Sequence, residues 1–248
     1  MRPPLILAYH VVGAVAPEHD PHHLAVTETA FRAQVETLRG RGYAFVTMAE
    51  LARRLPRANG LCALTFDDGA SDRVPELLAA LGVPGTLYVC PGLLGVPHPF
   101  LAPEAGVRLM TGEELAGLGE HVELGSHTLR HTVLADADAD TARRELVTSK
   151  AALEELCGAP VTTFAYPECG YSPACPPAAR EAGYATAVTC GPRGSLAPHE
   201  LRRVSVDALE NRLTWALKSR DLWRLAWSSP PGRVARAAAR PFRHGMLR

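Results

Sequence analysis

The chain has 248 residues, and its 26 basic residues are balanced by 26 acidic ones, so its formal net charge is zero. This length suits one ordinary domain with a substantial hydrophobic core. Without an overall positive field to attract nucleic acid, we expect no nucleic-acid partner.

Short apolar runs typical of β-strands recur along the first 206 residues, and helical patterns lie between most of them. The expected strands span residues 5–9, 43–47, 61–66, 85–90, 121–125, 161–166, 185–190 and 202–206. Strands that alternate with helices predict a parallel sheet with right-handed crossovers. Such a sheet, closed on itself, is a (β/α) barrel, and its active site lies at the C-terminal ends of the strands.

Several of the intervening helices have clear sequence signals. One carries an apolar face formed by Phe31, Val35 and Leu38. The spacing of Thr47 to Glu50, and of Thr111 to Glu114, predicts a capping box at the start of two further helices. A long helix is expected over residues 140–157, with leucines on its inner face.

Two adjacent carboxylates mark the end of the third expected strand. Asp67 and Asp68 follow the apolar run 61–64, and Gly69 comes directly after them. Buried charges are costly unless something uses them. Side chains alternate along a strand, so the two aspartates can face one site only where the chain turns, which Gly69 permits. In the alternative interpretation, Asp68 caps a helix that begins near Ser71.

His127 and His131 follow the strand expected at 121–125. Their i, i+4 spacing would place both imidazoles on one face of a helical turn, which suits a shared metal ion. Taken alone, the pair also fits an ordinary polar loop, because the chain has ten histidines. One carboxylate from the Asp67–Asp68 turn completes an Asp-His-His set. Such a set can hold zinc or another borderline divalent ion and leave positions open for water and substrate.

The sequence TFDDG at 65–69, followed about sixty residues later by HTLRHTVL at 127–134, resembles the NodB-type polysaccharide deacetylases of carbohydrate esterase family 4. The segment FAYP at 164–167, with Gly170 nearby, is similar to the third motif of that family. The resemblance extends over residues 5–207. It implies a distorted (β/α) barrel of about seven parallel strands, the NodB homology domain, in which the eighth expected strand is an extra edge.

The N-terminal region is similar to one subgroup of this family. Tyr9-His10 ends the first strand, and an F-x-x-Q-x-x-x-L pattern over 31–38 leads into Gly42-Tyr43. The subgroup deacetylates poly-N-acetylglucosamine-type exopolysaccharides, and its last motif, with the catalytic acid histidine, is circularly permuted to the N-terminus. The resemblance therefore implies the acid role for His10. The residues alone also fit a histidine that merely hydrogen-bonds at a strand end.

The resemblance implies further roles at the barrel mouth. Asp68, His127 and His131 would hold a divalent metal ion, with Zn²⁺ as the first choice and Co²⁺, Ni²⁺ or Fe²⁺ as alternatives. Asp67 would act as the general base on a water molecule. The backbone N–H of Glu168 would stabilise the oxyanion.

The remaining expected site residues bind or protonate the substrate. His10, in its charged form, would protonate the leaving amine. Tyr166, Pro167 and Arg203 are expected to contribute to substrate binding. Arg203 is also the candidate to replace an arginine that the third motif usually carries two residues before its proline, where this chain has Ala165.

The chain departs from the family pattern in other places too. The segment Glu168-Cys169-Gly170 is one residue longer than the common P-x-G form, which could shift the oxyanion donor. A clear aspartate-tryptophan motif is missing from the later part of the expected barrel. Cys169 is a conceivable nucleophile, but no base partner is evident, and an ordinary loop cysteine is the favoured interpretation.

The expected function is metal-dependent removal of N-acetyl groups from N-acetylglucosamine-containing glycans or glycoconjugates, with release of acetate. One alternative keeps the site and changes the bond, as in an O-acetyl esterase or another amide hydrolase. Another alternative is a catalytically silent glycan-binding domain, for which the complete set of candidate catalytic residues would be superfluous.

The chain divides into three expected parts. Residues 1–207 form the deacetylase-like barrel, and 208–227 form a helix on or beside it. Residues 228–248 carry five arginines and no acidic residue, so we expect a flexible basic tail, with contact to an anionic membrane or a protein as the alternative. Within the barrel, residues 91–110 are rich in Pro and Gly and are expected to form a substrate-facing loop.

The compartment is expected to be the cytoplasm, with membrane association as an alternative. No signal peptide or transmembrane segment is visible in the sequence. The six cysteines are scattered without a C-x-x-C pair and are expected to be reduced, buried residues.

Overall fold

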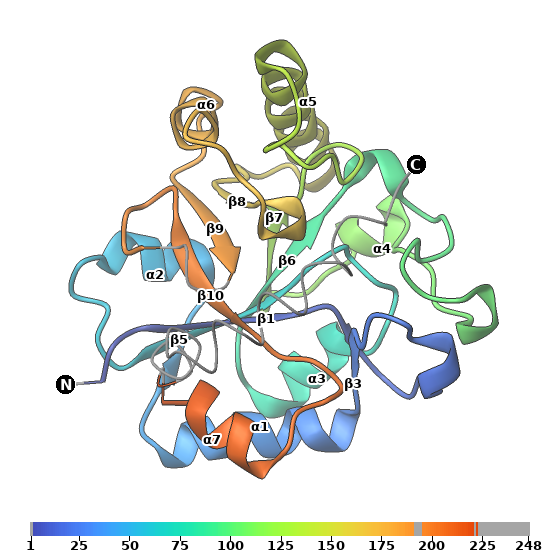
Figure 1. Cartoon of the computed structure of the whole chain (residues 1–248), viewed down its shortest axis with the longest axis vertical. Helices are drawn as coiled ribbons and strands as arrows, with labels where there is room; N and C mark the ends of the chain where they lie inside the picture. The colour runs from blue at the N-terminus through green and yellow to red at the C-terminus, as the bar shows by residue number, and fades with distance from the viewer. Residues whose placement is uncertain (1, 191–194, 221, 223–248) are drawn as a thin grey trace.

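Seven parallel β-strands close into a barrel in the computed structural model, which describes residues 2–190, 195–220 and 222 (Figure 1). The strands are β1 (Leu5–Tyr9), β5 (Leu61–Phe66), β6 (Gly85–Val89), β7 (Val122–Ser126), β8 (Thr163–Ala165), β9 (Thr186–Cys190) and β10 (Leu201–Ser205). Their order around the ring is β1-β10-β9-β8-β7-β6-β5, and the pairing of β5 with β1 closes it. The predicted seven-stranded (β/α) barrel is confirmed.

The strand expected at 43–47 lies outside this ring. It is the short β4 (Ala44–Phe45), which pairs with the first two residues of β5, whereas β6 pairs with the last two residues of β5. The eighth expected strand, at 202–206, was predicted to be the extra edge, but it is β10 of the ring, so this part of the prediction is wrong. Two further short strands, β2 (Val11–Val12) and β3 (Ala25–Val26), were not expected and pair only with each other.

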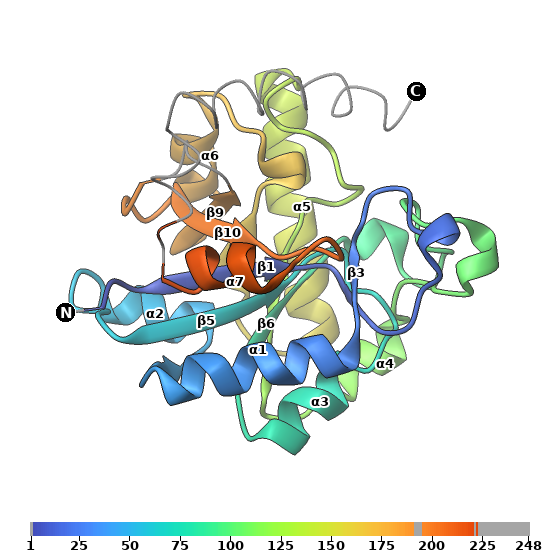
Figure 2. The same ribbon diagram turned by 60° about the horizontal axis from the view of Figure 1, so that its bottom comes forward.

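Helices surround the barrel, as Figures 1 and 2 show. They are α1 (Glu28–Gly40), α2 (Met48–Arg54), α3 (Val74–Leu81), α4 (Gly112–Ala116), α5 (Ala139–Cys157), α6 (Cys175–Glu181) and α7 (Arg212–Lys218). Thr111 and Glu114 form the reciprocal capping box predicted for α4. Thr47 caps α2 by accepting a hydrogen bond from the Glu50 N–H.

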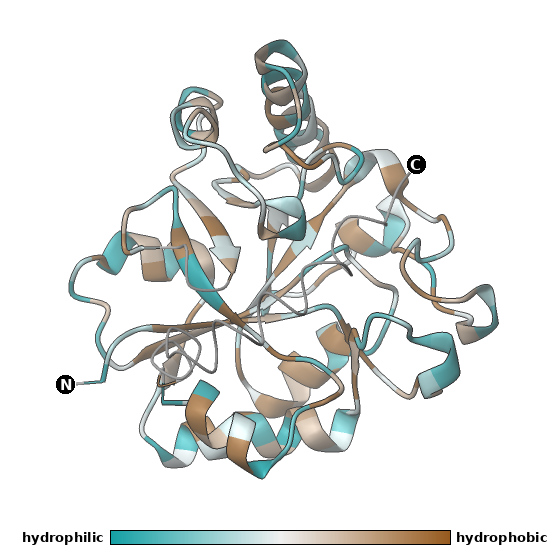
Figure 3. Ribbon diagram, in the orientation of Figure 1, coloured by the Kyte–Doolittle hydropathy of each residue, from teal (hydrophilic) through white to brown (hydrophobic). Residues whose placement is uncertain are grey.

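Alternation of side chains along the strands separates two buried layers. Leu5, Leu7 and Tyr9 of β1 belong to the larger core between strands and helices, where the Tyr9 ring stacks on Phe66 and meets Phe31 of α1 edge to face. Ile6, between them, belongs to a second core cluster together with residues of β5, β6, β8 and β9. Figure 3 shows hydrophobic residues concentrated in the strands and in the helices against them. This packing holds the strand ends, and the loops after them, in fixed positions.

The C-terminal helix is shorter among the described residues than predicted. The sequence pattern indicated a helix over 208–227, whereas α7 ends at Lys218, and 223–227 lie outside the described residues. Trp215 of α7 packs against the larger core, and Arg41, which follows α1, donates a hydrogen bond to the Ser219 hydroxyl. α7 accordingly lies beside α1 in both views (Figures 1 and 2).

The basic tail at 228–248, and the membrane or protein contact predicted for it, lie outside the described residues. None of the helices in the described part of the chain combines the length and apolar character that crossing a membrane requires.

Candidate active site

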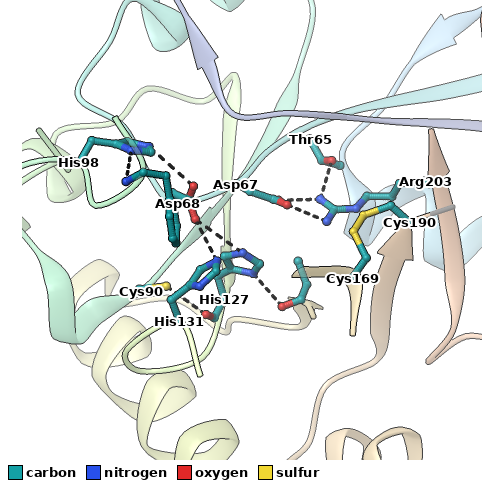
Figure 4. A network of polar contacts seen from close by, with 12 residues as sticks. Thr65, Asp67, Asp68, Cys90, His98, His127, His131, Cys169, Cys190 and Arg203 are labelled. Atoms are coloured by element: carbon teal, nitrogen blue, oxygen red, sulfur yellow. Dashed lines mark hydrogen bonds and ion pairs between the residues drawn. A yellow bond between two sulfur atoms is a disulfide. The ribbon is translucent and has the colours of Figure 1, made fainter. Parts of the chain in front are cut away.

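The predicted site residues converge at the C-terminal ends of the strands. His10 follows β1, Asp67 follows β5 and His127 follows β7. Tyr9 and Phe66 are direct neighbours in the sheet, and the Asp67 N–H donates a 2.9 Å hydrogen bond to the Tyr9 carbonyl oxygen. The barrel thus brings residues that are distant in sequence into one mouth, as Figure 4 shows.

The two aspartates diverge because the chain turns at Asp68 itself. Asp68 has a φ of 70° and Gly69 a φ of 77°, so two consecutive residues are left-handed. A left-handed conformation is uncommon for a residue other than glycine and often marks a functional site. The turn directs Asp67 toward β10 and Asp68 toward the histidines (Figure 4).

The alternative interpretation of Asp68 as a helix cap does not hold. The helix after it, α3, begins at Val74, and the Val74 N–H donates a 2.9 Å hydrogen bond to Asp72 instead. Both Asp68 carboxylate oxygens are buried, and neither has a hydrogen-bond partner in the part of the chain that the structure describes. A buried carboxylate without donors is costly, so Asp68 needs another partner.

The histidine pair lies in a loop, which corrects the predicted helical turn. Thr128 and His131 both have positive φ, 64° and 61°, and residues 127–131 form no helix. The Leu129 N–H donates a 2.7 Å hydrogen bond to the Glu145 carboxylate of α5, which holds this loop from outside. The two imidazole rings still meet, with centroids 4.9 Å apart.

The hydrogen bond made by the other ring nitrogen orients His127. Its Nδ1 lies 2.8 Å from the Ala165 carbonyl oxygen, which can only accept, so Nδ1 carries the proton. The Nε2 lone pair is therefore free to face Asp68. A histidine metal ligand is commonly fixed in this way by a backbone carbonyl.

The three side chains fit a divalent ion. The Nε2 atoms of His127 and His131 lie 3.7 and 3.4 Å from Asp68 Oδ1. Ligand atoms around a tetrahedral zinc ion, with bonds of about 2.0–2.2 Å, are roughly 3.3–3.6 Å apart. These three residues form the one group of potential metal ligands found in the described part of the chain. The partnerless oxygens of Asp68 are further support for the fit.

Burial shifts the pKa values of this group in the metal-free protein. It raises the pKa of Asp68 to about 6, an effect increased by the charge of Asp67 and opposed by that of His10. Burial lowers the pKa of His127 to about 3, and it also lowers the pKa of His131. Near neutral pH, the two histidines are therefore neutral and Asp68 is mostly ionised, as ligands to a cation must be.

These shifts predict how metal affinity depends on pH. Below pH about 6 the Asp68 carboxyl holds a proton that an incoming ion must displace, whereas His127, whose pKa burial lowers to about 3, holds none. We expect zinc affinity to weaken as pH falls through this range, approaching about tenfold per pH unit, with release of the Asp68 proton on binding. Calorimetry in two buffers of different ionisation enthalpy measures both quantities. A zinc affinity and a proton release that stay constant as pH falls through this range would contradict the raised pKa of Asp68.

Asp67 forms a buried, two-pronged ion pair with Arg203. The Nη1 and Nη2 atoms of Arg203 donate to the two carboxylate oxygens of Asp67 at 2.6 and 2.7 Å, and Nη1 also reaches Thr65 Oγ1 at 3.1 Å. Burial alone would raise the pKa of Asp67, but the charge and hydrogen bonds of Arg203 outweigh it and hold this pKa well below its ordinary value. Asp67 is therefore ionised at neutral pH, ready to accept a proton.

The structure thus places Arg203 where it can orient Asp67. Arg203 is only 1% exposed, and its guanidinium lies 5.5 Å from the Tyr88 ring centroid inside the barrel. Ala165, which occupies the position where the family's third motif has arginine, belongs to the same inner cluster as Tyr88. With both terminal nitrogens on Asp67, the Arg203 side chain is not open to substrate, although substrate binding was one of its two predicted roles.

His10 lies half-buried beside both aspartates. Its charge acts on the carboxylates of Asp67 and Asp68, lowering the pKa of each, and also acts on a further histidine, His98. The register of β1 with β5 accounts for this closeness, because His10 and Asp67 each follow one residue of the Tyr9–Phe66 pair.

The third motif forms a tight turn, the 3-10 helix η4 (Pro167–Cys169). Glu168 and Cys169 have φ values of 51° and 56°, so the longer Glu168-Cys169-Gly170 segment is accommodated by two left-handed residues. Tyr166 is fully buried, and its hydroxyl donates to the His199 carbonyl oxygen at 3.1 Å. Substrate binding by Tyr166 and Pro167, and the oxyanion role of the Glu168 N–H, remain predictions.

A disulfide joins Cys169 to Cys190, which corrects the expectation that all six cysteines are reduced. Cys190 ends β9 and is the direct sheet neighbour of Arg203. The bond therefore ties η4 to the barrel beside the Asp67–Arg203 pair (Figure 4). Cys169 has no free thiol to act as a nucleophile. Disulfides are typical of oxidising compartments, so the cysteines no longer favour the cytoplasm.

Replacement of both Cys169 and Cys190 by serine is expected to lower the free energy of unfolding by about 2–4 kcal/mol. Turnover should fall as well, because the left-handed turn at Glu168 loses its covalent anchor. Denaturant unfolding and acetate release measure the two effects, with Cys157→Ser as the control at a free cysteine. Six titratable thiols in the unreduced, unfolded parent protein would contradict the pairing.

His98 is a residue of this site that the sequence did not indicate. Its imidazole is buried, with Nε2 3.6 Å from Asp68 Oδ2. Burial lowers its pKa to about 4, and the charges of His10 and His131 act in the same direction. His98 lies in the loop 91–110, and no recognisable motif surrounds it. In the sequence, this loop was indicated only by its content of proline and glycine.

Several solved structures have a fold similar to that of this chain. A polysaccharide deacetylase from Bacillus cereus is 20% identical, with a TM-score of 0.73 over 87% of this chain and 68% of that one. The Streptococcus pyogenes deacetylase PplD, solved with acetate, is 23% identical, with a TM-score of 0.72 over 89% and 98% of the two chains. IcaB from Ammonifex degensii is 20% identical, with a TM-score of 0.69 over 90% and 98%. At these identities the likeness concerns the fold.

A search of curated proteins finds no match for this sequence. The family model described as polysaccharide deacetylase does match, over residues 55–187, which include the Asp67–Asp68 turn, both histidines and the third motif. Because this match spans more than half of the chain, the protein belongs to the polysaccharide deacetylase family.

Proposed function

We propose that this carbohydrate deacetylase is a metal-dependent hydrolase that removes N-acetyl groups from N-acetylglucosamine-containing glycans and releases acetate. One observation carries the proposal. Asp68 Oδ1 faces the imidazoles of His127 and His131, and neither Asp68 oxygen has a hydrogen-bond partner among the described residues, while the adjacent Asp67 is held ionised by Arg203. Two neighbouring carboxylates thus have different environments, one suited to a cation and the other to accepting a proton.

Asp68, His127 and His131 would hold the ion, which supplies a Lewis acid for the acetyl carbonyl and lowers the pKa of a bound water molecule. Zinc is the first choice for this ligand set, and Co²⁺, Ni²⁺ or Fe²⁺ could take the same positions. Asp67 accepts a proton from the attacking water molecule. Arg203 fixes the orientation of that carboxylate through both oxygens.

The remaining steps concern the developing oxyanion and the leaving amine. The backbone N–H of Glu168, at the left-handed turn after Pro167, is the proposed oxyanion donor. His10 donates a proton to the amine nitrogen as the carbon–nitrogen bond breaks, because an amine anion is a very poor leaving group. Acetate and a free amino sugar are the products.

Replacement of His10 by alanine is expected to slow hydrolysis of N-acetyl sugars by roughly a hundredfold. Hydrolysis of an aryl acetate should hardly change, since a phenolate leaves without being protonated. Acetate release from both substrates measures the difference, with His121→Ala, at the opposite end of the barrel before β7, as the control. Equal loss on both substrates would contradict the acid role.

A substrate panel tests the proposed bond specificity. We expect zinc-loaded protein to release acetate from N-acetylglucosamine oligomers or glycosides and much less from O-acetylated sugars such as acetylated xylan. Release of acetate from O-acetyl esters alone would contradict the proposed de-N-acetylation and would indicate that the protein is an esterase. Stoichiometric metal binding without release from any acylated sugar would favour a glycan-binding domain.

A further inference from the structure

The two oxygens of Asp68 face different partners. Oδ1 lies near the Nε2 atoms of His127 and His131, whereas Oδ2 lies 3.6 Å from Nε2 of His98. The side chain of His98 is completely buried, and its Nε2 has no hydrogen-bond partner among residues 2–190, 195–220 and 222. Two buried polar groups without partners thus point toward each other across a short gap (Figure 4).

The hydrogen bond made by the other ring nitrogen defines the role of His98. The Phe100 N–H donates to His98 Nδ1 at 3.4 Å, so Nδ1 is an acceptor and the neutral ring carries its proton on Nε2. An Nε2–H group cannot ligate a cation, but it can donate to a carboxylate. The group of potential metal ligands found in the described part of the chain consists of Asp68, His127 and His131 and does not include His98.

The loop that carries His98 is attached to the Asp68 turn. The Met110 N–H donates to the Gly69 carbonyl oxygen at 2.8 Å, and Leu109 forms an antiparallel bridge with Ala70. The His98 N–H in turn donates to the Val107 carbonyl oxygen at 3.0 Å. The return segment of the loop therefore links His98 to the residues directly after Asp68.

The tip of this loop also covers the histidine side of the site. The Phe100 ring centroid lies 4.8 Å from that of His131 and 6.0 Å from that of His98. The segment 98–100 therefore packs over the proposed metal ligands, which is why both His98 and Phe100 are buried. This loop was expected to face substrate, which stays a prediction, and at 98–100 it lies against Asp68 and His131.

We infer that His98 is a positioning residue, whose Nε2–H donates to Asp68 Oδ2 and so presents Oδ1 to the ion beside the two histidines. The inference rests on the proposed metal site. The 3.6 Å gap exceeds the 2.7–3.2 Å of an N–H···O hydrogen bond, so a small rotation of the Asp68 carboxylate toward His98 would be needed to form the bond. With Oδ2 engaged by His98, Asp68 would hold the ion through Oδ1.

Two variants of His98 distinguish its hydrogen-bond donation to Asp68 from the packing of its ring. His98→Phe keeps a ring but removes the donor, whereas His98→Gln keeps an N–H donor at similar reach. The control is His22→Gln, because the His22 ring lies 6.5 Å from that of Phe100 and has no described contact with a metal ligand. Zinc affinity of each full-length protein is measured by competition with a chelator, and the melting temperature of the chelated protein is measured in parallel.

We expect His98→Phe to weaken zinc binding by about 10- to 100-fold, the usual effect of removing a residue that orients a metal ligand. His98→Gln should lose much less affinity, and His22→Gln none. Unchanged affinity in folded His98→Phe would overturn the inference, as would equal losses in the Phe and Gln variants. A parent protein that binds no zinc would overturn the metal site itself, and with it the proposed function.

A measurement on the unsubstituted protein covers the case in which His98→Phe does not fold. Nitrogen-15 NMR of the imidazole side chains distinguishes the two neutral tautomers. The expected result is an Nε2–H tautomer for His98, with its proton signal moving to lower field when zinc is added, as the hydrogen bond to Asp68 shortens. An Nδ1–H tautomer, or an Nε2–H signal that does not respond to zinc, would overturn the inference.

Discussion

Replacement of Asp67 by asparagine is expected to leave zinc affinity unchanged and to slow acetate release by up to about 10⁴-fold. The amide cannot accept a proton from the attacking water, while Asp68, His127 and His131 are untouched. The Asp67 carboxylate also balances the charge of buried Arg203, so some loss of stability should accompany the loss of turnover.

The assay therefore needs three readouts on one preparation: bound zinc per chain, the melting temperature and the rate of acetate release. Asp136→Asn, in the exposed part of the loop after His131, is the control for changing an aspartate in this region. Substantial acetate release by folded, zinc-loaded Asp67→Asn would contradict the base assignment. Loss of zinc in this variant would instead indicate that Asp67 is a ligand.

Replacement of Arg203 by methionine is expected to lower the free energy of unfolding by about 3–5 kcal/mol, because it leaves the Asp67 carboxylate buried without its partner. The pKa of Asp67 lies below its ordinary value in the folded protein, so the ion pair stabilises the fold above the unfolded-state pKa and is lost as pH falls through the folded-state value. Without Arg203, the effect of burial, which raises the pKa of Asp67, is opposed only by the weaker influence of the nearby histidines, so this pKa should rise.

Two measurements distinguish this role from simple packing. The acidic limb of kcat/KM against pH should move to higher pH in Arg203→Met, since the base becomes protonated more readily. The double variant Asp67→Leu with Arg203→Met should recover much of the lost stability and none of the activity, because no unpaired charge remains. An unshifted acidic limb in a folded Arg203→Met protein would contradict the orienting role.

The sequence predicted the barrel well because hydrophobic runs and their spacing reflect burial directly. All eight expected strands are present, including the short β4 outside the ring. The Asp67-Asp68-Gly69 turn was also predictable, since two carboxylates at the end of a buried strand must have partners. The convergence of residues after β1, β5 and β7 follows from the parallel barrel alone.

The features that the sequence did not predict depend on tertiary contacts. The loop conformation of His127–His131 is set by hydrogen bonds to Glu145 and Ala165, which are distant in sequence. The pairing of Cys169 with Cys190 requires β9 to lie beside η4. His98 is unremarkable in the sequence, and only the folded loop brings it to Asp68.

Acetate release from short N-acetylglucosamine oligomers is the first measurement to make. It is performed with chelated protein, with the same protein refilled with zinc or cobalt, and with metal-loaded Asp67→Asn as the blank. We expect release only from the metal-loaded parent protein, because the reaction needs both the ion held by Asp68, His127 and His131 and the Asp67 base. Equal release by chelated protein, or none from the zinc-loaded or cobalt-loaded parent, would contradict metal-dependent de-N-acetylation.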